Sequence, residues 1–320
     1  MKNKTGNLVQ LLRRYNIIII LLLIFILAYI ISPEFRTISN IKNLLNHIAI
    51  IGILAVGQTV VLITGNFDLS HGSYIALSSV LLALLMPHGI LIAILGATLM
   101  LVFLGMFNAF FVNRGVVSLI VTLGMMGIAR SLAMFFSNTF AVPIDNDDFR
   151  RISFGDYVFG LPNSVIVWIL LVLLLSYILK HTRTGKHIYA TGGDKESARL
   201  SGVNIKKTTH IAYIISALCA VVAGVFYASR LGVGLPDSAV GYEMISIAAA
   251  VIGGASLFGG IGTQWGTLVG ALVFGIITNF LSLMGVSPFW QQVFSSLILG
   301  IAVYLNLRGT ANKKGERSYG

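Results

Sequence analysis

Charged side chains and cysteine are both scarce in this sequence. Aspartate, glutamate, lysine and arginine together make up 10% of the 320 residues, whereas an ordinary soluble domain contains about 25%. The chain is therefore not a conventional soluble domain. A single cysteine, Cys219, excludes an intramolecular disulfide. Because it lies inside an apolar segment, it predicts a small buried apolar residue and suggests no metal site.

The chain also lacks the residues that would let it bind a nucleotide or catalyse a reaction. A P-loop requires the pattern G-x-x-x-x-G-K-[ST]. Here Gly185-Lys186 has Lys180 where the first glycine belongs and His187 where serine or threonine should follow. No histidine, aspartate or glutamate residues cluster at catalytic spacing. The sequence therefore predicts no enzyme and no cofactor in this chain, so that ATP and Mg²⁺, if used, must be bound by a partner.

Long apolar runs, in contrast, recur along the whole chain, 56% of which is apolar. A bilayer-spanning helix needs roughly 20 consecutive apolar residues, which predicts an all-α polytopic membrane protein with about ten transmembrane helices. The run 17–31 exceeds the 7–15 residues of a signal-peptide core and has no cleavage site, so we expect it to be a retained first span. The ten segments are 16–32, 43–65, 72–86, 89–112, 115–136, 163–180, 208–231, 243–261, 264–286 and 288–307.

Two of these segments do not resemble simple spans. Segment 72–86 is short, and 243–261 is rich in glycine, which costs roughly 1 kcal/mol per residue against alanine in a helix. Irregular backbone at membrane depth is tolerated only inside protein or beside water. We therefore expect broken helices near 66–72 and 253–262. The stretches 63–72 and 251–260 also align as a weak internal repeat of parallel sense, as in many transporters.

The net charge of +11 reflects membrane topology. With ten spans and a cytoplasmic N-terminus, roughly 16 of the 22 lysine and arginine residues fall on the cytoplasmic side, as the positive-inside rule demands. This arrangement predicts one transmembrane domain over 1–320 with both termini cytoplasmic. It places the loop 181–207 in the cytoplasm and makes 137–162 the longest outer loop. Because topology explains the excess of basic residues, we expect no nucleic-acid partner.

The cytoplasmic loop contains a polar, helix-capable stretch, TGGDKESARLSGV (191–203). Gly192-Gly193 is expected to break the chain, Asp194 to cap a helix, and Gly202 to end it after about two turns. Glu196 and Arg199 share one face of that helix. So short a helix needs a surface to dock on. From physics alone, a docking element and a plain solvated loop are equally compatible with the stretch.

The segment Glu196–Gly202 resembles the E-A-A-x-x-x-G loop of binding-protein-dependent ABC permeases, with serine at the second position. GNFDLSHGSYIAL, LIVTLGMMGIARSLA and AAAVIGGASLFGGIGTQWGTLVGAL extend the resemblance to the ribose, xylose and autoinducer-2 group, closest to its ribose-type members. One departure is Asn66-Phe67, where the group usually has glycine and a branched aliphatic residue. The resemblance implies a helix that couples to an ATPase, formed by Gly193, Asp194, Glu196, Ala198, Arg199 and Gly202.

The same resemblance implies an importer in the bacterial cytoplasmic membrane. Its partners would be a cytoplasmic ATP-binding-cassette ATPase, an extracytoplasmic sugar-binding protein and a second permease, either identical or paralogous. The expected substrate is ribose, a related pentose or hexose, or an autoinducer-2-like sugar. Related permeases carry branched-chain amino acids or nucleosides, and an ion-coupled secondary transporter is a further alternative.

Several polar residues lie near membrane depth and are candidates for the translocation pathway. Asp68 is the acidic residue most embedded between apolar segments; with Ser70 it is alternatively a cap for the helix starting near His71. His71 is a weak candidate for a proton carrier. Neutral polar side chains suit a sugar, although each is equally able to bond a neighbouring helix; they are Gln58, Asn66, Asn108 and Asn279, with Thr122 and Ser246.

The outer loop carries charges of both signs. Asp145-Asn146-Asp147-Asp148 lacks the ligand spacing of a calcium loop, because Phe149 and Arg150 replace a ligand and the glycine. Together with Arg151 and Asp156, the cluster suggests a docking rim for a soluble partner. A merely solvated loop fits equally well.

Overall fold

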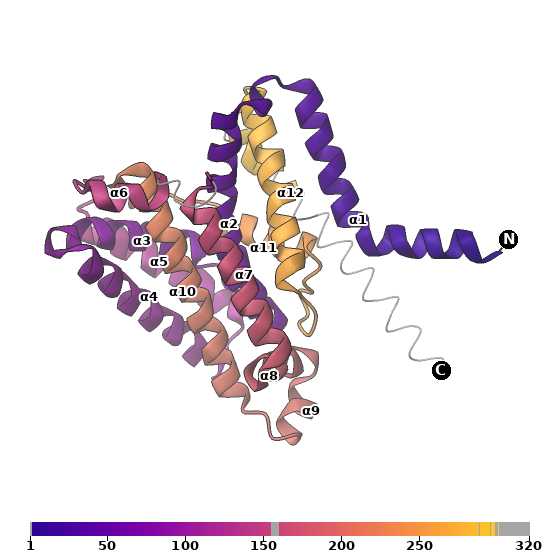
Figure 1. Ribbon diagram of the computed structural model, residues 1–320. Coiled ribbons are helices and arrows are strands. Elements are labelled where there is room, and N and C mark those ends of the chain that lie inside the picture. Colours follow the sequence, from indigo (N-terminus) through magenta and orange to yellow (C-terminus); the bar gives the residue numbers. More distant parts are fainter. Residues whose placement is uncertain (1, 155–159, 288, 295, 298–299, 301–320) are drawn as a thin grey trace.

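The computed structural model describes residues 2–154, 160–287, 289–294, 296–297 and 300 (Figure 1). Helices dominate it, and six of those within the described residues are long and apolar enough to cross a membrane. The shortest has 19 residues, which at 1.5 Å per residue reach about 28 Å, close to the thickness of a bilayer core. The six are α2 (Ile38–Ile63), α4 (Ile90–Val112), α5 (Ser118–Phe136), α7 (Asn163–His181), α10 (Ile205–Leu231) and α12 (Gln264–Leu283).

The expected count of ten spans is not reached in the described part of the chain. Helix α3 (His71–Leu85) has 15 residues and α11 (Tyr242–Ile252) has 11, so neither crosses a bilayer core alone. Helix α1 (Lys2–Ile31) is apolar only over Ile17–Ile31. Most of the expected span 288–307 lies outside the described residues. The helices do break at 64–70 and 253–263, the two places where the sequence predicted broken helices.

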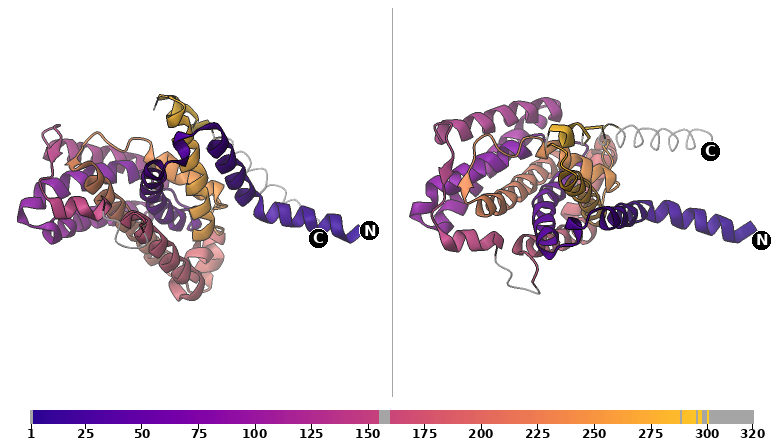
Figure 2. Two further views of the ribbon diagram at one scale, coloured as in Figure 1. Left: turned by 45° about the horizontal axis from the view of Figure 1, so that its top comes forward. Right: turned by 90° about the horizontal axis from the view of Figure 1, so that it is seen from above.

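Helix α2 forms the centre of the bundle, and its second half is completely buried. It packs against α7, α10, α11 and α12, as Figure 2 shows, while α3 lies against α4, α5 and α10. Small residues permit this close packing: a Cβ at Gly52 would overlap the indole of Trp168, and one at Gly57 would lie 2.8 Å from the Cβ of Cys219. As predicted, Cys219 is a buried free thiol.

The short elements gather at the two ends of the bundle. At one end, called the α6 end, lie α6 (Asp147–Phe154), the 3₁₀ turns Glu34–Arg36 and Met86–His88, and a two-stranded antiparallel ladder of β1 (Val142–Pro143) with β2 (Val233–Gly234). At the other, the α9 end, lie α8 (Arg183–Gly193) and α9 (Lys195–Leu200) (Figure 1).

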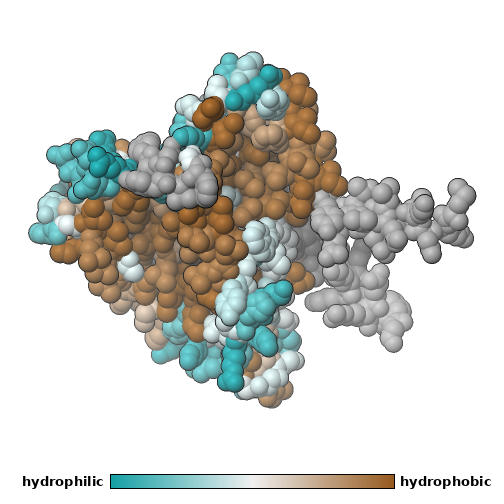
Figure 3. Space-filling model, viewed as in Figure 1, coloured by the Kyte–Doolittle hydropathy of each residue, from teal (hydrophilic) through white to brown (hydrophobic). Residues whose placement is uncertain are grey.

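The surface between these ends is apolar. Figure 3 shows a hydrophobic belt with polar residues above and below it. Helix α4 illustrates the pattern, because Leu91, Leu95, Leu99 and Phe103 follow one another at four-residue spacing and are all exposed. A continuous exposed apolar stripe of this kind is the face that a helix presents to lipid.

Candidate functional site

The chain between α2 and α3 carries a fully buried carboxylate, Asp68, which bonds to Ser70 and Ser216 in a polar cluster. Its Oδ1 accepts hydrogen bonds from the backbone N–H of Ser70, at 3.1 Å, and from the Ser70 hydroxyl. Its Oδ2 accepts a hydrogen bond from the hydroxyl of Ser216 on α10, at 2.7 Å. Both oxygens are therefore satisfied inside the protein, as a buried charge requires.

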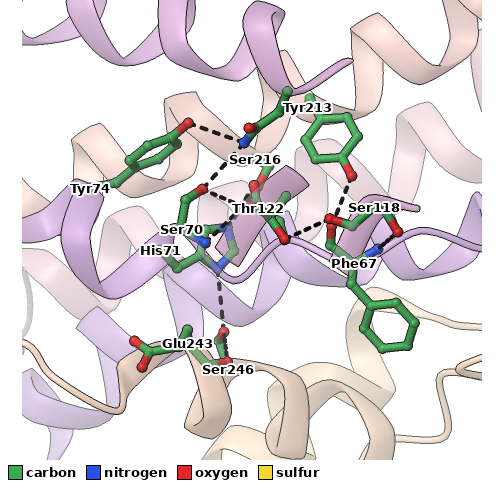
Figure 4. Close-up of polar contacts among 12 residues, drawn as sticks. Phe67, Ser70, His71, Tyr74, Ser118, Thr122, Tyr213, Ser216, Glu243 and Ser246 are labelled. Carbon is green, nitrogen blue, oxygen red and sulfur yellow. Dashed lines mark hydrogen bonds and ion pairs between the residues drawn. The ribbon is translucent and has the colours of Figure 1, made fainter. Parts of the chain in front are cut away.

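The imidazole of His71 extends this cluster across the bundle. Its Nε2 lies 2.6 Å from the Ser216 hydroxyl and 3.7 Å from Asp68 Oδ2, and its Nδ1 lies 3.3 Å from the hydroxyl of Ser246 on α11. The Ser246 hydroxyl also lies 2.8 Å from the carbonyl oxygen of Glu243. The cluster thus joins α3, α10 and α11 through side chains that are all buried (Figure 4).

The sequence proposed that Asp68 and Ser70 cap α3, and the structure corrects the detail. Ser70 occupies the N-cap position of α3, but its side chain makes no capping hydrogen bond to the helix. It donates to Asp68 instead, and the bond from its N–H to Asp68 two residues earlier forms an Asx-turn. The aspartate therefore shapes the entry into α3 and does not cap it.

The structure brings three of the six predicted pathway residues together and leaves three apart. Asn108 of α4 donates from Nδ2 to the Tyr74 hydroxyl at 3.3 Å and lies 3.5 Å from the Ser70 hydroxyl, so it joins Asp68 and Ser70. Asn66 bonds locally to Thr64. The other two, Gln58 in the interior of α2 and Asn279 near the end of α12, make no hydrogen bond to the cluster.

Those two amides differ in how they are paired. Asn279 exchanges two hydrogen bonds with Asn40 at the α6 end, at 3.0 and 3.2 Å. Gln58 is fully buried, yet neither its Nε2 nor its Oε1 has a hydrogen-bond partner in the part of the chain that the structure describes. Buried unpaired polar groups are rare in native proteins and call for an explanation. The two other named polar residues, Thr122 and Ser246, bond backbone carbonyls on their own helices.

The second broken segment, 253–263, meets the first at the α9 end of the bundle. The N–H of Gly260 donates to the carbonyl of Ile63, the last residue of α2, at 2.9 Å. Helix α11 runs from Tyr242, which contacts His47 near the α6 end, towards this point, as α2 does. Both breaks therefore follow helices of the same direction, which agrees with a parallel repeat.

Helix α8 packs onto this meeting point through glycine. A Cβ placed on Gly192 would overlap the carbonyl oxygen of Ile63 and lie 2.6 Å from the nitrogen of Gly260, and one placed on Gly259 would lie 2.9 Å from the Cα of Gly65. We call this contact of 63–65, 192–193 and 258–260 the glycine junction. A hydrogen bond from Tyr189 to the Gly262 carbonyl, at 2.6 Å, reinforces it. Partial burial raises the pKa of Tyr189 and keeps its phenol a donor.

The stretch 191–203 forms a helix as predicted, with one correction. Gly192-Gly193 does not break the chain, because α8 continues through both glycines; the break falls at Asp194, the N-cap of α9. Asp194 accepts a hydrogen bond from Ser197 N–H at 2.6 Å, which lowers the pKa of its carboxyl. The cap is therefore intact at neutral pH and would weaken only in acid.

Helix α9 presents mostly polar side chains to solvent, with one exception. Glu196 and Arg199 form an exposed ion pair, Ala198 is buried, and Gly202 ends the helix at a φ of 82°. Leu200, however, is 77% exposed at the tip of the helix. Sequence reasoning missed Leu200 and Tyr189, although a lone leucine among charged residues of a polar loop was a visible signal. Among the described residues no three histidine, cysteine, aspartate or glutamate side chains are placed to hold a metal.

Comparisons with known proteins show what the whole sequence is similar to. A family profile described as "Branched-chain amino acid transport system / permease component" matches residues 40–303. The ribose import permease of Escherichia coli K12 is 37% identical over 92% of this chain and 94% of its own length. The L-arabinose transport system permease of the same strain is 35% identical over 91% and 89%, and the ribose import permease of Bacillus subtilis 35% over 91% and 92%. No solved structure matches.

Proposed function

Since this chain belongs to the permease family of these transport systems, we propose that it is the membrane subunit of an ATP-binding-cassette importer for ribose or a related small sugar. It lies in the bacterial cytoplasmic membrane, with the apolar belt in the bilayer. We propose a sugar as the substrate because the similarity to ribose and arabinose permeases extends over about nine-tenths of the chain. Branched-chain amino acids are the alternative substrate, because the description of the family profile names them.

The α9 end supports a cytoplasmic ATPase as the energy source. A short capped helix that exposes a large apolar side chain needs a partner surface, because a helix of six residues is not stable alone. On this proposal α9 and Leu200 dock on the ATPase, which binds ATP and Mg²⁺, and the α9 end faces the cytoplasm. The permease then contributes motion and binding, and no catalytic residue.

The glycine junction is the contact through which movement of the docked α9 would reach the transmembrane helices. Movement of α9 moves α8, and the C-terminal end of α8 rests on the start of the first broken segment and on residues 258–260 of the second. A displacement of the junction therefore changes the positions of α2 and α12 together. Broken helices at paired positions are the elements that transporters use for alternating access.

The α6 end then faces outward and receives the substrate from a sugar-binding protein. Exposed charges of both signs on α6, Asp148 and Arg151 among them, suit a soluble partner. Asp156 of the predicted rim lies outside the described residues. We also propose that the chain works as a dimer, of itself or with a paralogue.

Mutating the ion pair of α9 tests the ATPase contact. The double change Glu196→Ala/Arg199→Ala is expected to lower ATP-driven uptake of ribose and arabinose at least tenfold in proteoliposomes and to reduce co-purification of the ATPase. The protein should still fold, because an exposed ion pair contributes at most about 1 kcal/mol. The assay uses the permease, its ATPase and its receptor.

The control for this experiment is Asp148→Ala/Arg151→Ala. It removes an equally exposed pair of the same i, i+3 spacing on α6, at the opposite end of the bundle. This variant should keep the ATPase bound. Equal loss of the ATPase in both variants would refute a specific role of α9, and uptake driven by an ion gradient without ATPase would refute the importer.

A second prediction concerns the unpaired amide of Gln58. Gln58→Met keeps the shape of the side chain and removes two unsatisfied polar atoms. The free energy of unfolding in detergent should therefore rise by about 1–3 kcal/mol. If the amide serves the pathway, uptake should fall several-fold in the same variant. Gln264→Met is the comparison, because Gln264 donates from Nε2 to the Val56 carbonyl and leaves only its Oε1 unpaired, so this variant should gain less stability than Gln58→Met. A destabilised Gln58→Met with normal uptake would contradict the pathway role.

A further inference from the structure

A polar cavity opens at the α6 end of the bundle, outside the buried cluster around Asp68. It has a volume of about 250 Å³ and lies between the first turns of α2, the last turns of α10 and α12, and the segment after α12. Pockets for drug-sized ligands start at roughly 300 Å³, so this one suits a smaller molecule. The residues that line it are Asn43, Leu44, His47, Arg230, Thr278, Asn279, Ser282 and Gln291.

Nearly all of these residues are polar, and three are available to a ligand. Among the described residues, the side chains of Asn43, Arg230 and Ser282 make no hydrogen bond to the protein, and Arg230 has no carboxylate partner within 4 Å. Arg230 lies in the last turn of α10, where the helix dipole favours a cation without a counter-charge. The cavity therefore offers a guanidinium, an amide and a hydroxyl from three different helices.

The remaining lining groups are held in place by the protein. Asn279 is fixed by its paired hydrogen bonds to Asn40, and the His47 ring lies 3.2 Å from the hydroxyl of Tyr242, against whose ring it packs edge to face. Their positions are thus set before a ligand arrives, which lowers the cost of binding. Donors and acceptors at fixed positions around a small space suit a molecule with several hydroxyl groups.

From this geometry we infer that the cavity is an outer binding site in which the permease receives a monosaccharide from its receptor. The inference rests on the proposed function and adds a place and a set of contacts to it. Arg230 and Asn43 would bond the hydroxyl groups of the sugar. A neutral ligand is favoured over an anion because Arg230 is the one formal cation among the eight lining residues, and five of the other seven are amides or hydroxyls.

Cysteine labelling tests the site in the complete transporter. The native Cys219 is buried, so Ser282→Cys supplies the reactive thiol for a membrane-impermeant maleimide. Ribose or arabinose at millimolar concentration should slow labelling of Ser282→Cys at least fivefold. Neither should change the labelling of Met284→Cys, an exposed position just after the same helix. Inorganic phosphate and gluconate serve as anionic probes.

Uptake in the same proteoliposomes separates failure of the site from failure of the proposed function. Ser282→Phe should fill the cavity and reduce sugar uptake at least tenfold, while Met284→Phe should not. Uptake by the unmodified complex without any protection of Ser282→Cys would overturn the site, as would protection by the anions alone. Protection without ATP-driven uptake would support the site and overturn the importer.

Discussion

Gly192→Ala is expected to lower ATP-driven uptake at least tenfold while the ATPase remains bound. The new methyl group would overlap the carbonyl oxygen of Ile63 and approach Gly260 N, and backbone atoms cannot move aside as a flexible side chain can. Helix α8 must then separate from the two broken segments. Docking through α9 would persist, but its motion would no longer reach the bundle.

The neighbouring residue provides a matched control. Gly193 contributes only its backbone to the glycine junction, because a Cβ there meets no described atom within 4 Å. Gly193→Ala should therefore leave uptake unchanged, and the helix should gain slightly because alanine is the better helix former. Uptake, ATPase co-purification and thermal stability are measured for both variants. Equal uptake in the two would exclude the glycine junction as the mechanical link.

The second large effect is expected at Asp68. Asp68→Ala removes the acceptor of three hydrogen bonds and the partner of His71, all fully buried. Each buried donor left without an acceptor typically costs about 1–3 kcal/mol. We therefore expect the variant to lose its sharp thermal transition in detergent and, with it, sugar uptake.

Asp68→Asn distinguishes this structural role from ion coupling. The amide oxygen can still accept from Ser70 or Ser216, so the variant should retain much of its stability and ATP-driven uptake. A secondary transporter that used Asp68 as its ion site would instead stay folded and lose coupled uptake completely. The measurement is uptake with ATP, and separately with a proton or sodium gradient. A stable Asp68→Asn protein without any uptake would contradict the structural role.

Much of the fold could be predicted from the sequence because its strongest signals are local. Apolar runs gave the long helices, and glycine and polar clusters gave the breaks at 64–70 and 253–263 and the start of α9 at Asp194. The expected count of ten spans is not confirmed within the described residues, where six helices are long and apolar enough to cross a membrane. Hydropathy measures how apolar a segment is and does not distinguish burial in protein from contact with lipid. Helices α3 and α11 are apolar because they are buried in protein, although both are too short to cross a bilayer.

The candidate site was less predictable because its contacts join distant segments. Asp68 and Asn108 were chosen from their surroundings, but nothing in the order of residues reveals that Ser216 and Ser246 complete the cluster around His71. The same holds for Asn43 and Arg230, which meet only through the packing of α2 and α10. Gly192 was predicted to break the chain, whereas its lack of a side chain serves the contact with Ile63.

The glycine junction also limits how this permease can be re-engineered. A transporter that accepts a foreign ATPase is most simply made by exchanging the segment around α8 and α9. Such a chimaera places new atoms against Ile63, Gly65 and Gly260, where the backbones are in direct contact. The three segments must therefore be exchanged as one unit. If the loop alone were exchanged, the foreign ATPase would bind, but its movement would not reach the transmembrane helices.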